Sequence, residues 1–392
     1  MSHKIIFIAN NNIGYGLSGG DTIFIELLHH WQSNNKITLI ACQEAINILP
    51  TSITKIKIIK TDSINNNPNN NLLNLLLHYV RRIYFGVRTI KNKKKQLKNN
   101  DYVYSVSDFL PDLLPALYLK ILYPKIKWIV GFYLFAPFPF AQNSPYTGIN
   151  RIKGFIYWFI QLITKTIVSL FADIVFITSV PDIKHFSKNN KIIVIRGGVN
   201  LSEINKYKKN HPILPISKRK YDGCFMGRFH PQKGCLELIK IWQQVVSKIP
   251  SAKLAIIGQG EMESKMKQLI NKYNLTKNIT FFGFQNGKPK YDIFTNSKVI
   301  IHPATYDSGG MASAEAMAFG LPGVSFDLEA LKTYYPKGFI KTKCFSNKIF
   351  AQNIIKLLKH KDVYVKLSQE SKNLVQSHWD WAKRSQEIYN EI

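Results

Sequence analysis

Short apolar runs alternate with longer amphipathic stretches along most of the chain. In the first half these runs predict strands at Lys4–Ala9, Ile37–Cys42, Val103–Val106, Lys127–Val130, Ile174–Thr178 and Ile192–Ile195. Near-continuous apolar strands separated by helices are typical of a parallel sheet with both faces covered. The first run is followed by a Gly-rich loop and a helix expected to begin near Thr22, with Asp21 or Thr22 as its cap. Residues 1–200 are therefore predicted to form a Rossmann-like α/β domain.

The same alternation starts again after a polar, basic segment. Asn200–Asp222 contains two prolines and is predicted to be a linker. Beyond it, apolar runs are each followed by a short loop, and they predict strands at Asp222–Met226, Lys253–Ile257, Ile279–Phe282, Val299–His302 and Val324–Asp327. Residues 201–377 are thus predicted to be a second Rossmann-like domain.

The longest apolar stretch, Gly154 to Val180, is broken by Gln161, Lys165 and Asp173. No uninterrupted part of it reaches the roughly 18 to 20 apolar residues that cross a bilayer, so we predict a buried helix followed by a strand. The apolar run at the N-terminus, Ile5 to Ala9, is too short for the core of a secretory signal. The expected location is cytoplasmic.

Composition adds a strong basic charge. Hydrophobic residues make up 45% of 392 residues, which excludes a mostly disordered chain; 53 Lys and Arg against 24 Asp and Glu give a formal charge of +29. Such a balance indicates an anionic partner, unless it reflects only a general abundance of Lys. The excess is spread over both halves, which argues against a nucleic-acid-binding tail. The four cysteines lack zinc-site spacing, so we expect no metal and buried thiols in a reducing compartment.

Candidate chemistry begins with Arg228 and Lys233, in the loop that follows the first strand of the second domain. Gly227 and Gly234 flank them, and a helix is expected from Cys235. A guanidinium, an ammonium and the free N–H groups of a helix start suit a diphosphate. The alternative is an Arg and a Lys on a solvated loop.

Asp307 and Glu315 lie in the segment DSGGMASAE, across the start of a predicted helix. Gly309, Gly310 and Met311 would present backbone N–H groups to an anion there. Two carboxylates beside such a site suit hydrogen bonds from sugar hydroxyls, although they could also be a turn residue and a solvated helix residue. Because the neighbours of Glu315 are apolar, we expect it to be largely buried, and a buried carboxylate needs a partner such as a ligand.

These motifs resemble glycosyltransferase family 4. The runs FMGRFHPQKGCLELIKIW, AKLAIIGQGE, NITFFGF and YDIFTNSKVIIHPATYDSGGMASAEAMAFGLPGVSFD carry the resemblance in the second domain, and LSGGD carries a weaker one in the first. The resemblance implies the α/β GT-B fold, in which two Rossmann-like domains face a central cleft. It also implies that the last helix, 378–392, packs back on the first domain.

The resemblance further implies a role for each motif residue. Arg228 and Lys233 would hold the donor diphosphate and neutralise the leaving group, and Glu315 would bind the ribose hydroxyls. Asp307 takes the first acidic position of the family's Glu-x7-Glu signature, one methylene shorter, and would face the transferred sugar. The remaining donor contacts would be the backbone of Gly309, Gly310 and Met311, the base-pocket side chain of Phe284, and Gly19 and Gly20 of the first domain.

The first domain departs from the family because its region WIVGFYLFAPFPFAQNSPYTG lacks the His that many relatives place beside the reacting sugar. Tyr133, Asn143 or a backbone carbonyl are the replacements we consider. The loop could instead form an apolar acceptor wall, crowded by Phe132, Phe135, Phe138 and Phe140. Asp108 and Asp112 could approach the acceptor, or Asp108 could cap a helix.

Residues 81–98 contain eight basic side chains with apolar ones interleaved, and no acidic residue lies between Asp62 and Asp101. This stretch predicts contact with an anionic membrane surface or, equally, a solvated basic helix.

The sequence as a whole therefore predicts a retaining hexosyltransferase. It would use a UDP- or GDP-sugar and a glycan or lipid-linked acceptor, without a metal or other cofactor and without nucleic acid. It would be free in the cytoplasm or peripheral on the inner face of the membrane. The alternatives are a GT-B sugar-nucleotide epimerase and a non-catalytic module that binds nucleic acid.

Overall fold

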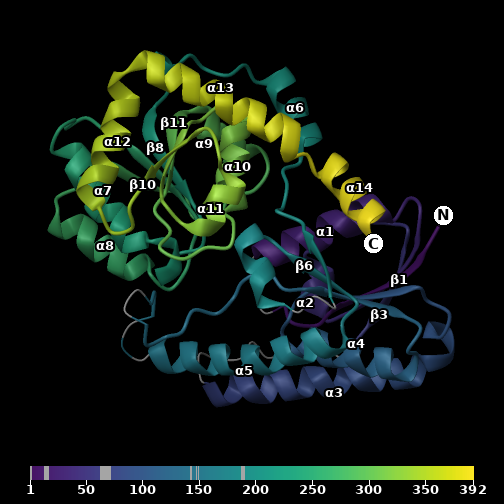
Figure 1. Cartoon of the computed structure of the whole chain (residues 1–392). Coiled ribbons are helices and arrows are strands. Elements are labelled where there is room, and N and C mark those ends of the chain that lie inside the picture. The colour runs from purple at the N-terminus through teal and green to yellow at the C-terminus, as the bar shows by residue number, and fades with distance from the viewer. Residues whose placement is uncertain are drawn as a thin grey trace. The chain divides into compact units, whose positions relative to one another are not determined.

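The computed structural model describes residues 2–12, 17–61, 72–141, 144–146, 148, 150–186 and 190–392. The chain divides into two compact units (Figure 1): unit 1 comprises Met1–Arg196 with Ser385–Ile392, and unit 2 comprises Gly197–Arg384. The boundary differs from the predicted one because Asn200–Asp222 is not a linker. It contains helix α6 (Leu201–Asn210), whose Ile204 and Tyr207 are buried in unit 2.

Unit 1 is built on a seven-stranded parallel sheet with the order β3-β2-β1-β4-β5-β6-β7. The strands are β1 (Lys4–Ala9), β2 (Lys36–Ala41), β3 (Ile56–Lys60), β4 (Tyr102–Ser105), β5 (Lys127–Gly131), β6 (Ile174–Ile177) and β7 (Lys191–Val194). Six of them confirm predicted runs to within a residue or so. The edge strand β3 escaped prediction, since its side chains are exposed or only half-buried.

The helices of unit 1 cover both faces of this sheet. Helices α3 (Leu72–Leu97), α4 (Leu110–Leu122) and α5 (Asn150–Phe171) lie on one face and α1 (Gly19–Trp31) on the other, as Figure 1 shows; the short α2 (Gln43–Asn47) and η1 (Val180–His185) complete the unit. Helix α1 begins earlier than predicted. Ser18, and not Asp21 or Thr22, is its cap, because the Ser18 hydroxyl accepts from the backbone N–H of Asp21 while the Asp21 carboxylate accepts from that of Ser18.

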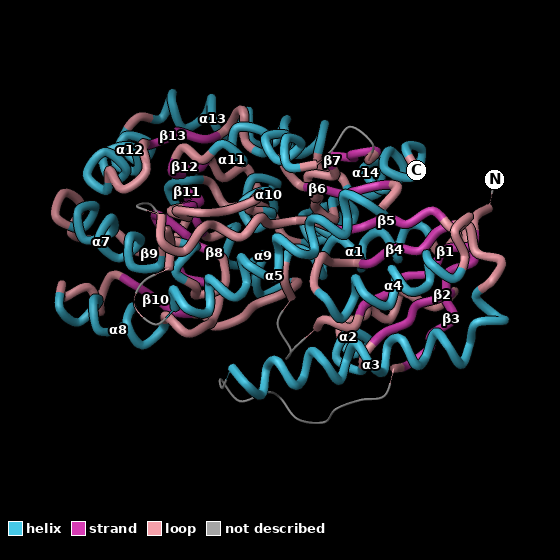
Figure 2. Tube along the Cα trace, turned by 60° about the horizontal axis from the view of Figure 1, so that its bottom comes forward, coloured by secondary structure: helices cyan, strands magenta, loops and turns pink. Residues whose placement is uncertain are grey.

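Unit 2 repeats the plan with a six-stranded parallel sheet of order β10-β9-β8-β11-β12-β13. Its strands are β8 (Tyr221–Met226), β9 (Leu254–Ile257), β10 (Ile279–Phe281), β11 (Ser297–His302), β12 (Gly323–Phe326) and β13 (Phe339–Thr342). Its further helices are α7 (Cys235–Val246), α8 (Glu263–Lys272), α9 (Lys288–Thr295), α10 (Met311–Ala318), α11 (Glu329–Tyr334), α12 (Asn347–Lys359) and α13 (Lys361–His378). Figure 2 shows the strands of each sheet running between their helices. The predicted α/β class with two Rossmann-like units is confirmed.

The chain end is shared between the units. Helix α14 (Trp381–Glu391) begins in unit 2, where Trp379 and Trp381 are buried, and Ser385–Ile392 belongs to unit 1. There the Trp31 indole N–H donates to the Ser385 carbonyl at 3.0 Å and Ile388 is fully buried. The last two turns thus form part of the first unit.

Helix α5 corrects one prediction. The helix is followed by a strand, as expected, but most of it is not buried. Of its most apolar 18-residue segment, 22% lies inside the protein. By length and composition alone it is also the one helix of the described chain that could cross a membrane.

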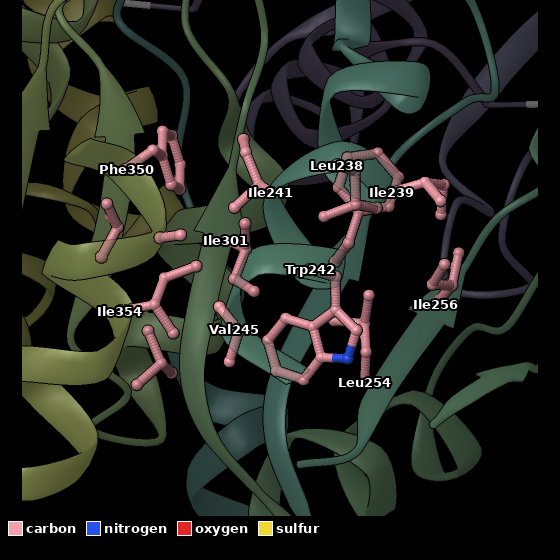
Figure 3. Close-up of a cluster of buried hydrophobic side chains, with 14 of the residues drawn as sticks. Leu238, Ile239, Ile241, Trp242, Val245, Leu254, Ile256, Ile301, Phe350 and Ile354 are labelled. Carbon is pink, nitrogen blue, oxygen red and sulfur yellow. The ribbon is translucent and has the colours of Figure 1, made fainter. Parts of the chain in front are cut away.

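Trp242 of α7 is one of the largest side chains buried in unit 2 (Figure 3). It is fully buried among Leu238, Leu254, Ile301 and their neighbours. The sheet makes room for it with a glycine, since a Cβ on Gly223 would lie 2.7 Å from Ile301 and 3.0 Å from the indole. The core is therefore closed around this ring.

Trp242→Ala should lower the free energy of unfolding by about 3–5 kcal/mol, because the cavity it leaves is lined by residues that cannot collapse into it. Urea unfolding of the full chain would measure this. Ile349→Ala, at a half-exposed position of α12, is the control and should change stability by less than about 0.5 kcal/mol. A loss below 1 kcal/mol for Trp242→Ala would contradict this account of the core.

Candidate active site

The candidate site lies where the connections of the unit 2 sheet change direction. Strands β8 and β11 are parallel neighbours, while the chain proceeds from β8 toward β9 on one side and from β11 toward β12 on the other. The loops that follow β8 and β11 therefore leave the same sheet edge side by side, which is where open α/β sheets bind ligands. These loops carry Arg228 and Lys233 on one side and Asp307 on the other.

The loop after β8 is held tightly to the loop after β11. Gly234 has φ +66°, and a Cβ there would come within 1.8 Å of the Pro303 carbonyl oxygen. The Gln232 carbonyl accepts from the N–H of Thr305 at 3.0 Å. These contacts need a glycine, and they fix Lys233 opposite Asp307.

Lys233 and Asp307 form a close ion pair. The Lys233 Nζ lies 2.7 Å from Asp307 Oδ2, and His302 Nε2, at the end of β11, lies 3.3 Å from the same oxygen. Asp307 and His302 are almost fully buried, whereas Lys233 is 28% exposed. The predicted phosphate ligand and the predicted sugar ligand are thus brought together, and in this structure each is the partner of the other.

The charge states of this group follow from its burial and its neighbours. Burial by itself would raise the pKa of Asp307, but the Lys233 charge and the contact with His302 outweigh it and hold that pKa well below its ordinary value. Burial lowers the pKa of His302 against the opposing pull of Asp307, so the imidazole is neutral at pH 7. On the ring itself, Nε2 faces Asp307, and Nδ1 shares a hydrogen bond of 3.2 Å with the Ser313 hydroxyl, whose direction depends on the tautomer.

Arg228 is free to meet a ligand. Its side chain is exposed, and among the residues with a defined position it has no ion-pair partner. It therefore joins the site as a cation whose charge is not neutralised within the protein.

The start of α10 is shaped by two glycines. A Cβ on Gly309 would lie 2.4 Å from the Tyr334 ring, and one on Gly310, which has φ +94°, would lie 2.7 Å from the His302 ring. The Asp307 Oδ1 accepts from the Ser308 N–H at 2.9 Å, and the Tyr335 hydroxyl donates to the Gly310 carbonyl. Gly310 is the cap residue and offers no side chain, so the N–H groups of Met311 and the residues after it lack a side-chain cap.

Glu315 corrects an argument from the sequence. It is 25% exposed rather than largely buried, and it already has a partner: Lys290 Nζ, on α9, lies 2.7 Å from its Oε2. Lys290 is itself 6% exposed. A missing protein partner therefore cannot support a ligand role for Glu315, whose carboxylate is already paired with Lys290.

The remaining donor residues have different positions. Phe284 is 48% exposed after Gly283, which has φ +66°. Gly19 and Gly20 form the first turn of α1 in unit 1, where a Cβ on Gly20 would lie 3.2 Å from the Tyr133 ring. The predicted roles of these three residues stay predictions.

In unit 1 the candidate acceptor residues are mostly structural. Asp112 accepts from the backbone N–H groups of Asn10 and Asn11, and Asp108 accepts from Gln161 Nε2 at 2.9 Å, so Asp108 is not a helix cap. Burial raises the pKa of each carboxyl to about 7. Phe132 is a core residue and lines no acceptor wall.

Two other candidates remain in unit 1. The Tyr133 hydroxyl contacts that of Tyr104. Asn143 lies outside the described residues.

Metal-binding side chains do not gather within the described ranges, where no group of three His, Cys, Asp or Glu could hold an ion. All four thiols are free; Cys42, Cys224 and Cys235 are buried and Cys344 is half-buried. Sequence reasoning missed His302 and Lys290. His302 could have been noticed as the residue that ends the strand before Asp307, whereas nothing in the sequence pairs Lys290 with Glu315.

Comparison with known proteins identifies the class. Residues 206–374 match the family described as glycosyl transferases group 1. This segment makes up most of unit 2, and the match confirms the resemblance to glycosyltransferases found in the motifs.

Individual proteins agree with this assignment. An uncharacterized glycosyltransferase of Methanocaldococcus jannaschii is 27% identical over 55% of this chain, which spans only 57% of that relative's length. A capsular polysaccharide biosynthesis glycosyltransferase of Staphylococcus aureus is 23% identical over 81% of this chain and 90% of its own. The crystal structure of Anabaena HepE in complex with UDP and glucose superposes with a TM-score of 0.71 at 13% identity, over 99% of this chain and 98% of that one. The fold is thus GT-B.

The tight turn at Gly234 predicts a contrast with Gly283, which has the same φ of +66° but open space around a Cβ. Gly283→Ala should cost about 1 kcal/mol of stability, the penalty of the left-handed backbone. Gly234→Ala adds a collision with Pro303 and should cost about 3 kcal/mol or more. Thermal unfolding of the two variants measures the difference, and equal losses would show that the Pro303 contact does not constrain the loop.

The low pKa of Asp307 predicts a pH dependence of stability. A carboxyl whose folded-state pKa is depressed stabilises the fold above its unfolded pKa of about 3.9, and this contribution is lost as the pH falls further. Asp307→Asn should therefore cost about 3 kcal/mol between pH 7 and about pH 5, and the difference from the natural protein should shrink below about pH 4.

Urea unfolding at a series of pH values measures this difference. Glu329→Gln, which breaks an exposed ion pair with Lys332, is the control and should change little at any pH. A difference that grows on acidification would refute the assignment of a buried, ionised Asp307.

Proposed function

We propose that the protein is a retaining glycosyltransferase that moves a hexose from a UDP- or GDP-sugar to a hydroxyl of a glycan or lipid-linked oligosaccharide. The observation that carries the proposal is the Lys233–Asp307 pair beside the unneutralised Arg228, at the switch point of a group 1 glycosyltransferase domain. The UDP and glucose bound to HepE support a uridine nucleotide donor, and the capsular polysaccharide relative supports a glycan acceptor.

The donor diphosphate would be held by cations of two kinds. Arg228 offers a bidentate guanidinium, and Lys233 would exchange the Asp307 carboxylate for a phosphate oxygen. The N–H groups at the start of α10 would add partial positive charge. Glu315, which pairs with Lys290, would accept from the ribose hydroxyls, and the exposed ring of Phe284 would border the base.

Catalysis would come from charge placement. As the bond between sugar and diphosphate breaks, negative charge grows on the phosphate oxygen, where Arg228 and Lys233 stabilise it. Asp307, released from Lys233, would face the sugar hydroxyls. The acceptor hydroxyl would attack on the face that the diphosphate leaves and pass its proton to the departing phosphate oxygen, so that the anomeric configuration is retained. We propose no metal or other cofactor for this step.

The location follows from charge. Arg81, Arg88, Lys91, Lys94 and Lys95 are exposed on α3, and we propose that this part of residues 81–98 meets the anionic inner face of the cytoplasmic membrane. We propose unit 1 as the unit that receives the acceptor, and no nucleic-acid partner.

Binding of UDP, GDP and ADP and of their sugars, measured by calorimetry, tests the donor site. Arg228→Ala should weaken nucleoside diphosphate binding about 10- to 100-fold, because a charge-assisted hydrogen bond is lost. Lys267→Ala, another exposed cation of unit 2 that pairs with Glu263, is the matched control and should bind normally.

Product analysis completes the test. Transfer from the bound donor to a lipid-linked oligosaccharide, with retained configuration, is the expected result. Conversion of the donor sugar in the absence of an acceptor would show that the protein is an epimerase and not a transferase. Failure of every nucleotide to bind would sink the proposal.

A further inference from the structure

Helix α5 is amphipathic, but its large apolar side chains face outward and its small or polar ones face the unit, which is the reverse of the usual arrangement in a globular protein. Its buried residues are small or polar ones, Gly154, Gln161 and Thr164, together with Val168. The opposite side exposes large apolar side chains at helical spacing, with exposed fractions of 40–71% at Ile152, Phe155, Phe159, Ile163 and Leu170. A helix that rested only on its own sheet would turn these side chains inward.

An exposed aromatic cluster extends this apolar side. Phe138 and Phe140, from the segment after β5, are 44% and 55% exposed. The Phe138 ring lies 5.0 Å from Trp158 and 5.8 Å from Phe140, whose own ring lies 6.1 Å from Phe155. The rings are ordered against one another on the outside of the unit.

Helix α3 shows the same reversal. Leu73, Leu77, Val80 and Tyr84 lie on one side of the helix and are 47–62% exposed. The opposite side buries His78 and Arg82, and Arg82 Nη2 lies 2.7 Å from Glu44. Further along, the exposed side of α3 becomes basic, with Arg88, Lys91 and Lys95.

The two helices lie on the same face of the unit 1 sheet. Both pack against α4, and Figure 1 shows both at the bottom of unit 1, below its strands. We call their exposed apolar residues, together with Phe138 and Phe140, the outer surface.

The charge around the outer surface indicates which kind of partner binds there. Neither 72–98 nor 113–172 contains an acidic residue, so the charged side chains that these segments place beside the apolar ones are Lys and Arg. A second copy would bring these cations together, whereas an anionic lipid bilayer offers both hydrocarbon and negative headgroups.

The inner side of α5 decides how the helix meets that bilayer. Gln161 Nε2 donates to Asp108 Oδ2 at 2.9 Å and to the Leu134 carbonyl at 2.7 Å, and its Oε1 accepts from the Ala136 N–H. A spanning α5 would leave these groups without partners. Gln161 thus fastens the helix to unit 1, and the buried Gly154, Thr164 and Val168 lie on the same side of it, which favours a helix that lies along a membrane over one that crosses it.

We propose that the outer surface inserts into the headgroup region of an anionic bilayer, with α5 parallel to the membrane and the aromatic cluster among the acyl chains. The proposal rests on the proposed function only for the location at a membrane, not for sugar transfer. It assigns the main anchoring to apolar side chains of α5 and its loop, and a secondary, salt-sensitive part to α3.

Flotation with lipid vesicles tests the proposed insertion. The protein is mixed with vesicles of phosphatidylcholine alone or with about 30 mol% phosphatidylglycerol, at low and at high NaCl concentration. The natural protein should float with the anionic vesicles and stay bound at high salt. The double variant Phe155→Ser with Phe159→Ser should bind at least about tenfold more weakly at both salt concentrations. Lys91→Gln with Lys95→Gln should weaken binding at low salt only.

The matched control is Ile349→Ser with Val365→Ser, which changes two equally exposed apolar residues of unit 2 and should float like the natural protein. Light scattering and UDP binding accompany each variant. Loss of flotation with UDP binding intact is the expected behaviour of the α5 variant. Absence of flotation by the natural protein, or a dimer that the α5 variant converts to monomer, would overturn the proposal, whereas flotation without nucleotide binding would count against the proposed function alone.

Discussion

Strands β8 and β11 run in the same direction, hydrogen-bonded to each other, and the connections that leave them turn to opposite sides. This single constraint brings together two loops that are 74 residues apart in the chain and places Lys233 against Asp307. The glycines around the pair serve the same end, because at Gly234 and Gly310 a side chain would collide with Pro303 or His302. The Lys233 charge and the contact with His302 hold the pKa of Asp307 low against its burial, whereas burial lowers the pKa of His302.

Most strands of the two sheets could be predicted from the sequence, because strands that are buried on both faces consist of nearly continuous apolar residues. The exceptions have physical causes. Strand β3 is an edge strand with exposed side chains, and α6 was mistaken for a linker because its lysines outnumber the two residues, Ile204 and Tyr207, that anchor it. The motif residues of the site were found for a related reason, since each lies directly after a strand or at a helix start.

The partners of those residues could not be found in the same way. Lys290 reaches Glu315 across two elements, and only the packing of α9 beside α10 brings the charges within 2.7 Å. Helix α5 is a second case. Its hydropathy indicates an apolar helix, but the bonds from Gln161 to Asp108 and Leu134 decide which side faces the sheet. Average hydropathy contains no such information, so the sequence suggested burial where the structure has exposure.

The Lys233–Asp307 contact has a consequence for selectivity. In a chain with a formal charge of +29, an uncovered pocket of cations would attract any phosphate-bearing polymer or metabolite. Asp307 neutralises Lys233 in this structure, and in the proposed function the donor diphosphate would have to displace it. A single phosphate that replaced Asp307 would gain the contact with Lys233 but would break the Lys233–Asp307 ion pair. A ligand that also binds Arg228 and the backbone of α10 would make further contacts that offset this loss. Without a ligand, the charge of Lys233 is thus balanced by the protein itself, and the site would favour ligands that bind at several points.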